Sequence, residues 1–334
     1  MHIKKAAKII NEGGLVVIPT ETVYGLGGNG CLDSSAKKIY EAKGRPSDNP
    51  LIIHIYEPQD AEKYAYTNNT YYSLAKAFMP GPLTVVLKKK DIIPYSVTGG
   101  LETVAIRCPS HIVARELIRE CGVPIAAPSA NISGSPSPTK ASHVIDDMMG
   151  RVDMIIDGGD CEFGLESTIV KIEDDGSAVL LRPGKITVEQ LLEIIPCVSI
   201  ADAVTSKLNE GETVLSPGMK YRHYAPKSPV FLIDGDEDEF IAYICKKTVD
   251  KNIAVICYDS CKNKIKALAP DAYIYSFGDR DDEIKQAHLL FDILRDADKR
   301  NFDEIYAPLP AKNGVGLALY NRMIRAAAYQ IIRL

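Results

Sequence analysis

Apolar and polar positions alternate with two different periods along the first 200 residues. Helical spacing of apolar residues predicts helices over 3–11, 34–43 (capped by Asp33 or Ser34), 71–78 and 112–121. Short apolar runs predict strands at 15–19, 51–55, 83–87, 104–107, 123–127, 154–157, 168–172 and 178–182. Some of these strands follow one another directly and others are separated by helices. This mixture predicts a twisted, open α/β sheet that is mixed and not strictly parallel.

The apolar periodicity becomes weak after residue 200 and is clear again from residue 230. Residues 201–212 are polar and weakly helical, and 216–226 (SPGMKYRHYAP) has neither period, which favours an extended connector. Beyond it, strands are predicted at 230–233, 253–257, 272–276 and 304–306, and helices at 237–247, 283–297 and 316–332. This βαβ rhythm predicts a smaller Rossmann-like domain. The predicted domains are therefore 1–205 and 229–334, joined by a connector at 206–228.

Composition restricts the function classes without choosing one. The 334 residues are 46% hydrophobic and 25% charged, with a net charge of −5, which is typical of a soluble globular protein and leaves no basic excess for a dominant nucleic-acid surface. No signal-peptide pattern and no apolar run of about 18 residues is present. The eight cysteines contain no CxxC pair, so we expect reduced thiols in a cytoplasmic protein.

A glycine-rich segment at 25–30 (GLGGNG) matches the dinucleotide fingerprint GxGxxG. The fingerprint requires its glycines directly between a strand and a helix, whereas residues 20–24 separate these glycines from the preceding strand. We therefore interpret them as turn glycines with positive φ. A GxxxxGK[ST] phosphate loop is absent from the sequence.

Two polar segments flank this region. Thr20, Glu21 and Thr22 come directly after an apolar strand, where side chains project into a crevice. The proline-bounded segment 43–50 (KGRPSDNP) brings Lys43 and Arg45 to a helix end. Such cations often only complement the helix dipole, but two prolines that stiffen the loop also fit phosphate binding. Both readings stay open at this point.

Two further features are ambiguous when taken alone. His54 lies within a strand, where a histidine is commonly just a half-buried side chain. The loop 127–137 (APSANISGSPS) offers hydroxyls and amides for phosphate or ribose, and a solvated loop has the same composition. It lacks the GxSxG elbow of a serine hydrolase.

Taken in order, six segments resemble the YrdC-type threonylcarbamoyl-AMP synthases, in the long form with an extra C-terminal domain. They are 19–26 (PTETVYGL), 43–54, 80–84 (PGPLT), 127–134, 166–170 (ESTIV) and 216–226. The resemblance implies an enzyme that condenses L-threonine and bicarbonate with ATP, releases pyrophosphate and supplies threonylcarbamoyl-AMP for tRNA modification. It also implies a deep, positively lined cavity, Mg²⁺ that arrives with ATP, and a separate tRNA threonylcarbamoyl transferase complex that takes the product.

The resemblance further implies roles for individual residues. Lys43 and Arg45 would stabilise charge on the phosphate as catalytic residues. Threonine would be held by Thr22, His54, Arg107, the backbone at Ala127, and Ser167. ATP would be held by Arg45, Asn49, Thr103, Ser129, Asn131, Ser137, Arg182 and, from the connector, His223. No carboxylate cluster in the sequence predicts a dedicated metal cage.

Two other functions fit the sequence less well. An RNA-binding or regulatory module is disfavoured by the mildly acidic charge. Carbamoyl transfer, as in YrdC-like domains of hydrogenase-maturation proteins, would require acylphosphatase and zinc-finger regions that the sequence lacks. Direct binding of tRNA and the oligomeric state are left open.

Overall fold

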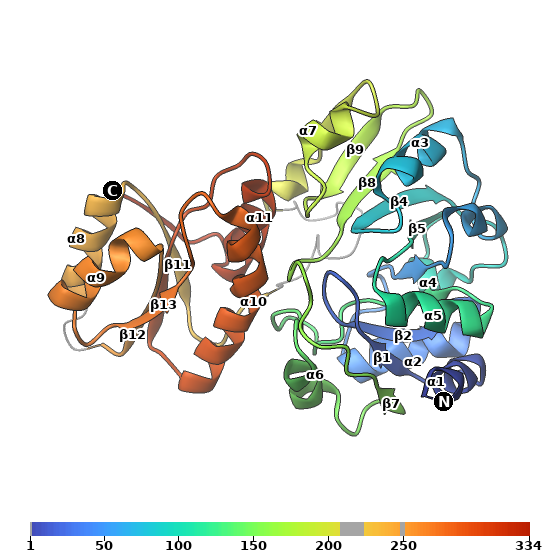
Figure 1. Ribbon diagram of the computed structural model, residues 1–334, viewed down its shortest axis with the longest axis horizontal. Coiled ribbons are helices and arrows are strands. Elements are labelled where there is room, and N and C mark those ends of the chain that lie inside the picture. Colours follow the sequence, from blue (N-terminus) through green and yellow to red (C-terminus); the bar gives the residue numbers. More distant parts are fainter. Residues whose placement is uncertain (1, 208–223, 248–250) are drawn as a thin grey trace. The chain divides into compact units, whose positions relative to one another are not determined.

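The protein divides into two compact units, each with its own sheet (Figure 1). The structure, a computed structural model, describes residues 2–207, 224–247 and 251–334. One unit comprises Met1–Ser133 and Ser137–Tyr221, and the other comprises Gly134–Pro136 and Arg222–Leu334. Most of the predicted connector, including 208–223, lies outside the described residues.

The first unit is built on a ten-stranded mixed sheet in the order β10-β9-β8-β4-β5-β3-β6-β2-β1-β7, which confirms the predicted mixed sheet. Its strands are β1 (Val16–Ile18), β2 (Gly25–Asn29), β3 (Ile52–His54), β4 (Leu83–Lys88), β5 (Thr103–Arg107), β6 (Ile125–Ala126), β7 (Met154–Ile155), β8 (Thr168–Ile172), β9 (Ala178–Arg182) and β10 (Val198–Ile200). Its helices are α1 (His2–Asn11), α2 (Asp33–Lys43), α3 (Asn69–Phe78), α4 (Tyr95–Thr98), α5 (Ile112–Cys121), α6 (Ala141–Met148) and α7 (Val188–Leu192), with 3₁₀ turns at Pro58–Lys63 and Asp202–Val204.

Gly25, Gly27 and Gly28 lie in a strand and not in a turn with positive φ, so the sequence-based interpretation of this segment was wrong. Gly25 to Asn29 make up the buried strand β2, and none of these glycines has a positive φ. A Cβ on Gly27 would lie 2.9 Å from Cγ2 of Ile125 and 3.0 Å from the carbonyl oxygen of Val16. These glycines are therefore explained by close packing of the backbone against neighbouring strands.

The second unit has five parallel strands in the order β13-β12-β14-β11-β15, which confirms the predicted Rossmann-like sheet. The strands are β11 (Val230–Asp234), β12 (Ile253–Cys257), β13 (Tyr273–Ser276), β14 (Glu304–Pro308) and β15 (Ile331–Arg333). The helices are α8 (Glu237–Lys247), α9 (Asp259–Leu268), α10 (Glu283–Arg300) and α11 (Gly316–Ala326). Figure 1 shows α8 and α9 on one face of this sheet and α10 and α11 on the other. Phe240, Ile244 and Ile265 bury the first pair of helices against β11, β12 and β14.

Two sequence predictions about helix ends were wrong. The last helix stops at Ala326 instead of 332, because Ala328 and Tyr329 take positive φ and the chain turns into β15. The N-cap of α2 is Leu32, without a side-chain hydrogen bond, so neither Asp33 nor Ser34 caps it. Asp33 lies inside the first turn, where it pairs with Lys37 at 2.5 Å. Helices α4, α6, α7 and α9 and strand β10 were not predicted.

Candidate functional site

A polar segment, residues 20–22, follows β1 and is fixed by hydrogen bonds. Thr20, Glu21 and Thr22 are nearly fully buried. The Thr20 hydroxyl donates to the carbonyl oxygen of Val23 at 2.6 Å and accepts from the backbone N–H groups of Thr22 and Val23 at 3.2 and 3.3 Å. This side-chain-to-backbone turn fixes the direction of the two residues that follow Thr20.

Arg107, at the end of β5, is the charged centre of the site. Its Nη2 lies 2.7 Å from Oε1 of Glu21, in an ion pair whose side chains are 5% and 7% exposed. Its Nη1 donates to Oγ1 of Thr22 at 2.8 Å. Burial alone would raise the pKa of Glu21, but the Arg107 guanidinium holds that pKa below its usual range. The carboxylate is therefore ionised, and it fixes the orientation of Arg107.

Strand register places three polar side chains in one row of the sheet. Arg107 is the partner of His54 in β3 and of Thr84 in β4. Paired residues on adjacent strands project from the same face. His54, Arg107 and Thr84 therefore face the same side of the first sheet.

His54 is held as a neutral imidazole. Burial, followed by the charge of Arg107, lowers the pKa of His54 to about 3. Its Nδ1 lies 3.3 Å from the carbonyl oxygen of Ile125. A carbonyl oxygen only accepts, so Nδ1 carries the proton and Nε2 is left as an acceptor.

Ser167 links this row to β9. Its hydroxyl lies 2.8 Å from Oγ1 of Thr84 and accepts from Nη2 of Arg182 at 3.1 Å. Arg182 also donates from Nε to the Ser167 carbonyl at 3.0 Å. The segment before Ser167 runs beside the β1 turn, since the backbone N–H groups of residues 163 and 164 donate to the carbonyl oxygens of residues 21 and 22. We call the resulting set the buried cluster: Glu21, Thr22, His54, Thr84, Arg107, Ser167 and Arg182.

Lys43 ties the end of α2 to the loop after β6. The side chain is only 1% exposed, and its ammonium donates to the carbonyl oxygens of Ser129 at 2.5 Å and Asn131 at 2.6 Å. The backbone N–H of Ser133 in turn donates to the Lys43 carbonyl at 2.9 Å. The segment 43–50 and the loop 127–137, which are far apart in the sequence, are thus held together by Lys43.

The guanidinium of Arg45 bends back over its own loop. It donates to the carbonyl oxygens of Asn49 at 3.3 Å and Pro50 at 3.1 Å. Asn49 is 1% exposed, and its Oδ1 has no hydrogen-bond partner among the residues that the structure describes. A buried amide oxygen without a partner is costly, and a bound hydroxyl or amino group would satisfy it.

The loop after β6 presents the remaining hydroxyls. The Ser129 hydroxyl donates to Oδ1 of Asn131, and the Ser137 hydroxyl donates to Oε1 of Glu166, both at 2.5 Å. The backbone N–H of Ala127 donates to the Ile52 carbonyl at 2.9 Å, which places Ala127 beside the start of β3.

One predicted site residue, Thr103, lies apart from these groups, and another lies outside the described residues. Thr103 begins β5 and Arg107 ends it, so the two lie about 13 Å apart along the strand. The geometry thus gives no support to Thr103 as a site residue, and its role stays a prediction. His223 lies outside the described residues, so its role also stays a prediction.

The sequence interpretation missed three residues of the site. Glu21 pairs with Arg107, Thr84 contacts Ser167, and Glu166 accepts from Ser137. Each lies inside one of the six segments of the resemblance, but only the fold reveals its partner. A single acidic residue directly after an apolar strand was the available signal for Glu21.

The described residues were also compared with the features of metal sites, membrane-spanning helices and disulfides. Across residues 2–207, 224–247 and 251–334, no group of three or more His, Cys, Asp or Glu side chains is placed to hold a metal ion. Within the same residues, no helix has the length and apolar character needed to cross a membrane. All eight cysteines are free.

Comparison with known proteins gives full-length matches. A family model described as telomere recombination, covering Sua5, YciO and YrdC, matches residues 8–184, and one described as threonylcarbamoyl-AMP synthase, C-terminal domain, matches 186–328. The chain is 43% identical to threonylcarbamoyl-AMP synthases of Pyrococcus abyssi (99% of this chain, 95% of the relative) and Bacillus subtilis (99% and 94%). A crystal structure of P. abyssi Sua5 complexed with L-threonine superposes with a TM-score of 0.90 at 43% identity, covering 99% of this chain and 96% of that one.

Proposed function

The chain belongs to the Sua5–YciO–YrdC family, in the long form with the threonylcarbamoyl-AMP synthase C-terminal domain, and on that premise we propose that it makes threonylcarbamoyl-AMP. Bicarbonate and the threonine amine form N-carboxy-threonine with loss of water. A carbamate oxygen then attacks the α-phosphorus of ATP, and pyrophosphate leaves. The protein would thus be a nucleotidyltransferase that supplies the threonylcarbamoyl group for tRNA modification.

The observation that carries the threonine site is the buried cluster around Arg107. A guanidinium has five N–H donors, and Glu21, Thr22 and the Gly81 carbonyl occupy only part of that set, so Arg107 can still bind an α-carboxylate. The free Nε2 acceptor of neutral His54 suits an N–H of the substrate amine, which must be unprotonated to react. Ser167 and the backbone at Ala127 complete the proposed threonine contacts.

The triphosphate is proposed to lie against the segments joined by Lys43. Arg45, Asn49, Ser129, Asn131, Ser137 and Arg182 supply its contacts, with Thr103 and His223 as further candidates. The carbamate is itself a nucleophile, so the protein supplies alignment and electrostatic stabilisation instead of a covalent intermediate. Lys43 and Arg45 are assigned to the charge that grows on the phosphate oxygens. The partnerless amide oxygen of Asn49 supports a ligand in this place.

Three parts of the proposal concern what surrounds the reaction. Mg²⁺ is expected to enter with ATP, bound mainly by phosphate oxygens, as is usual for this ion. The product is expected to pass to a tRNA threonylcarbamoyl transferase complex. The reaction is expected to take place in the cytoplasm, where ATP, threonine and tRNA are available together.

Pyrophosphate release by the purified chain tests this function. With ATP and Mg²⁺ present, release should require both L-threonine and bicarbonate, and leaving out either should reduce it to background. Arg107→Lys should raise the KM for threonine because a lysine loses the paired contact with the carboxylate. Release that is indifferent to threonine would refute the proposal.

A further inference from the structure

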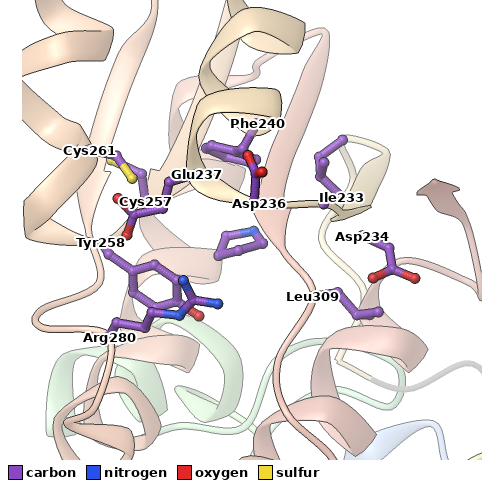
Figure 2. Close-up of a pocket in the computed structure, with 12 residues that line it drawn as sticks. Ile233, Asp234, Asp236, Glu237, Phe240, Cys257, Tyr258, Cys261, Arg280 and Leu309 are labelled. Carbon is purple, nitrogen blue, oxygen red and sulfur yellow. The ribbon is translucent and has the colours of Figure 1, made fainter. Parts of the chain in front are cut away.

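A cavity lies wholly within the C-terminal unit, at the carboxyl ends of its parallel strands (Figure 2). Its volume is about 150 Å³. It is lined by the ends of β11, β12 and β14, the first turn of α8, the start of α9 and the loop that follows β13. We call it the C-terminal cavity.

The strand order marks this location as a ligand site on topological grounds. From β11 the chain crosses to β12 through α8, on one face of the sheet, whereas from β14 it crosses to β15 through α11, on the other face (Figure 1). Because β11 and β14 are neighbours, the two connections leave a crevice between them. In open α/β sheets, ligands bind in the crevice at such a switch point.

The charges around the C-terminal cavity disfavour a phosphate-bearing ligand. The first turn of α8 carries Glu237, Asp238 and Glu239, and Asp236 precedes it. Asp236 and Glu239 also cap the helix reciprocally, each accepting at 2.9 Å from the backbone N–H of the other. The helix end that would attract an anion is therefore both satisfied and surrounded by negative charge.

These carboxylates still have acceptor capacity that faces the cavity. Asp236 uses one oxygen for its cap, and Glu237 uses one to accept from the hydroxyl of Ser260 at 2.8 Å. Glu237 also interacts with the Cys261 thiol, and each carboxylate still has lone pairs that these contacts do not use. Asp234, by contrast, lies 3.8 Å from the guanidinium of Arg333, in an exposed ion pair outside the proposed contacts.

The guanidinium of Arg280 lines another side of the C-terminal cavity. Figure 2 shows Arg280 beside Tyr258, away from Asp236. The guanidinium lies 6.0 Å from the centre of the Tyr258 ring and makes no ion pair within the described residues. Apolar groups, among them Phe240, Cys257 and Leu309, form the rest of the lining.

We propose that the C-terminal cavity binds a free α-amino acid with a small apolar side chain. Its ammonium group pairs with Asp236 and Glu237, its carboxylate pairs with Arg280, and its side chain lies on the apolar lining. The volume supports a ligand of this size, because pockets for drug-sized molecules measure about 300–1,000 Å³. This site is separate from the proposed threonine site and does not depend on it.

Binding of labelled L-alanine, L-valine and L-leucine to the full chain, measured by equilibrium dialysis, tests the proposal. Each ligand is measured in two series, one without L-threonine and one with saturating L-threonine to fill the proposed threonine site. At least one of the three should bind with a stoichiometry of one in both series. The matching amine without a carboxylate, and the matching acid without an amine, should each bind about ten- to a hundredfold more weakly, as expected for loss of one charged contact. L-threonine alone is titrated as well and should bind with a stoichiometry of one, because its hydroxyl does not suit the apolar lining; a stoichiometry of two would overturn the preference for an apolar side chain.

Variants locate the site. Arg280→Gln and Glu237→Gln should each weaken binding about tenfold or more. Asp238→Asn, a neighbour that does not line the cavity and pairs with Lys264, should leave binding unchanged. Circular dichroism and the Tm of each variant establish that it is folded. The proposal is overturned if no amino acid binds saturably, if the amine alone or ATP binds as well as the amino acid, or if Arg280→Gln binds like the wild type. Pyrophosphate release by the wild type is measured separately, so failure here is distinguishable from failure of the proposed enzyme activity.

Discussion

The two polar regions of this protein are built in opposite ways. In the buried cluster, Arg107 is paired with a carboxylate at 2.7 Å and is almost completely removed from solvent. In the C-terminal cavity, Arg280 is exposed and unpaired within the described chain. The first region fixes its charges by internal contacts before any ligand arrives, whereas the second leaves its charges to be paired by the ligand. Substitutions should therefore cost folding stability in the first region and only ligand affinity in the second.

The largest stability effect is expected at Glu21. Glu21→Ala would leave the Arg107 guanidinium buried without its carboxylate, and breaking a buried ion pair costs about 3–5 kcal/mol. Urea unfolding measures the loss. Glu116→Ala, which breaks an exposed pair with Arg119, is the control and should cost about 0.5 kcal/mol or less. Equal losses would show that burial of the pair has no special weight.

Arg45→Ala should mainly affect catalysis. If Arg45 meets charge that develops on the phosphate, kcat/KM should fall by an amount equivalent to about 2–4 kcal/mol. Arg45→Lys keeps the charge and should lie between the alanine variant and the wild type. Unchanged kcat/KM in Arg45→Ala would remove this residue from the catalytic assignment.

A smaller effect is expected at Ser167, the link between Thr84 and Arg182. Ser167→Ala leaves buried polar partners unsatisfied, which costs about 1–3 kcal/mol. The cost should appear as a higher KM for threonine and as reduced stability. Ser199→Ala on β10, where the side chain is exposed, serves as the matched control and should change neither quantity.

The acid dependence of stability should report on His54. The folded pKa of about 3 lies below the ordinary value of 6.5, so only the unfolded chain binds this proton between those pH values. Its contribution to stability is complete above pH 6.5 and is lost as the pH falls toward 3, by at most about 1.4 kcal/mol per pH unit. Glu21, whose pKa is also lowered, adds its own loss only below its ordinary pKa of 4.5. An NMR titration showing the His54 ring protonated near pH 6.5 in the folded protein would contradict this.

The smallest stability effect should come from the second region. Arg280→Gln removes an exposed guanidinium whose described side-chain contact is the Tyr258 ring. Its free energy of unfolding should change by no more than about 0.5 kcal/mol. A loss of unfolding free energy as large as that of Glu21→Ala would show that the two regions do not differ in their contribution to stability.

Much of the fold was predictable because its strands are apolar and short. The mixed sheet and the parallel second sheet followed from hydrophobic period alone. The glycine-rich strand β2 did not, because local propensity assigns glycines to turns, and only the neighbouring backbone at Gly27 explains their presence in a strand. The end of α11 was also missed, since the apolar residues that follow it pair with β11 instead of continuing the helix.

The sequence was enough to name many residues of the candidate site, but not to predict which of them contact one another. His54 and Arg107 come together through strand register, and Thr22 reaches Arg107 from the turn after β1. The sequence specifies neither contact. Glu21 and Thr84 were missed because their roles depend on partners 86 and 83 positions away in the chain, reached only after folding. Thr103 lies at the other end of β5 from Arg107, and its role in binding ATP stays a prediction.

Isotope tracing tests the proposed chemistry most directly. The purified chain is incubated with ¹³C-bicarbonate, L-threonine and ATP labelled at the α-phosphate, and the product is identified by mass spectrometry. We expect one product that carries both the labelled carbon and the labelled phosphate, and whose formation requires threonine. A threonine adenylate without the labelled carbon, or AMP formed without threonine, would contradict the proposed function.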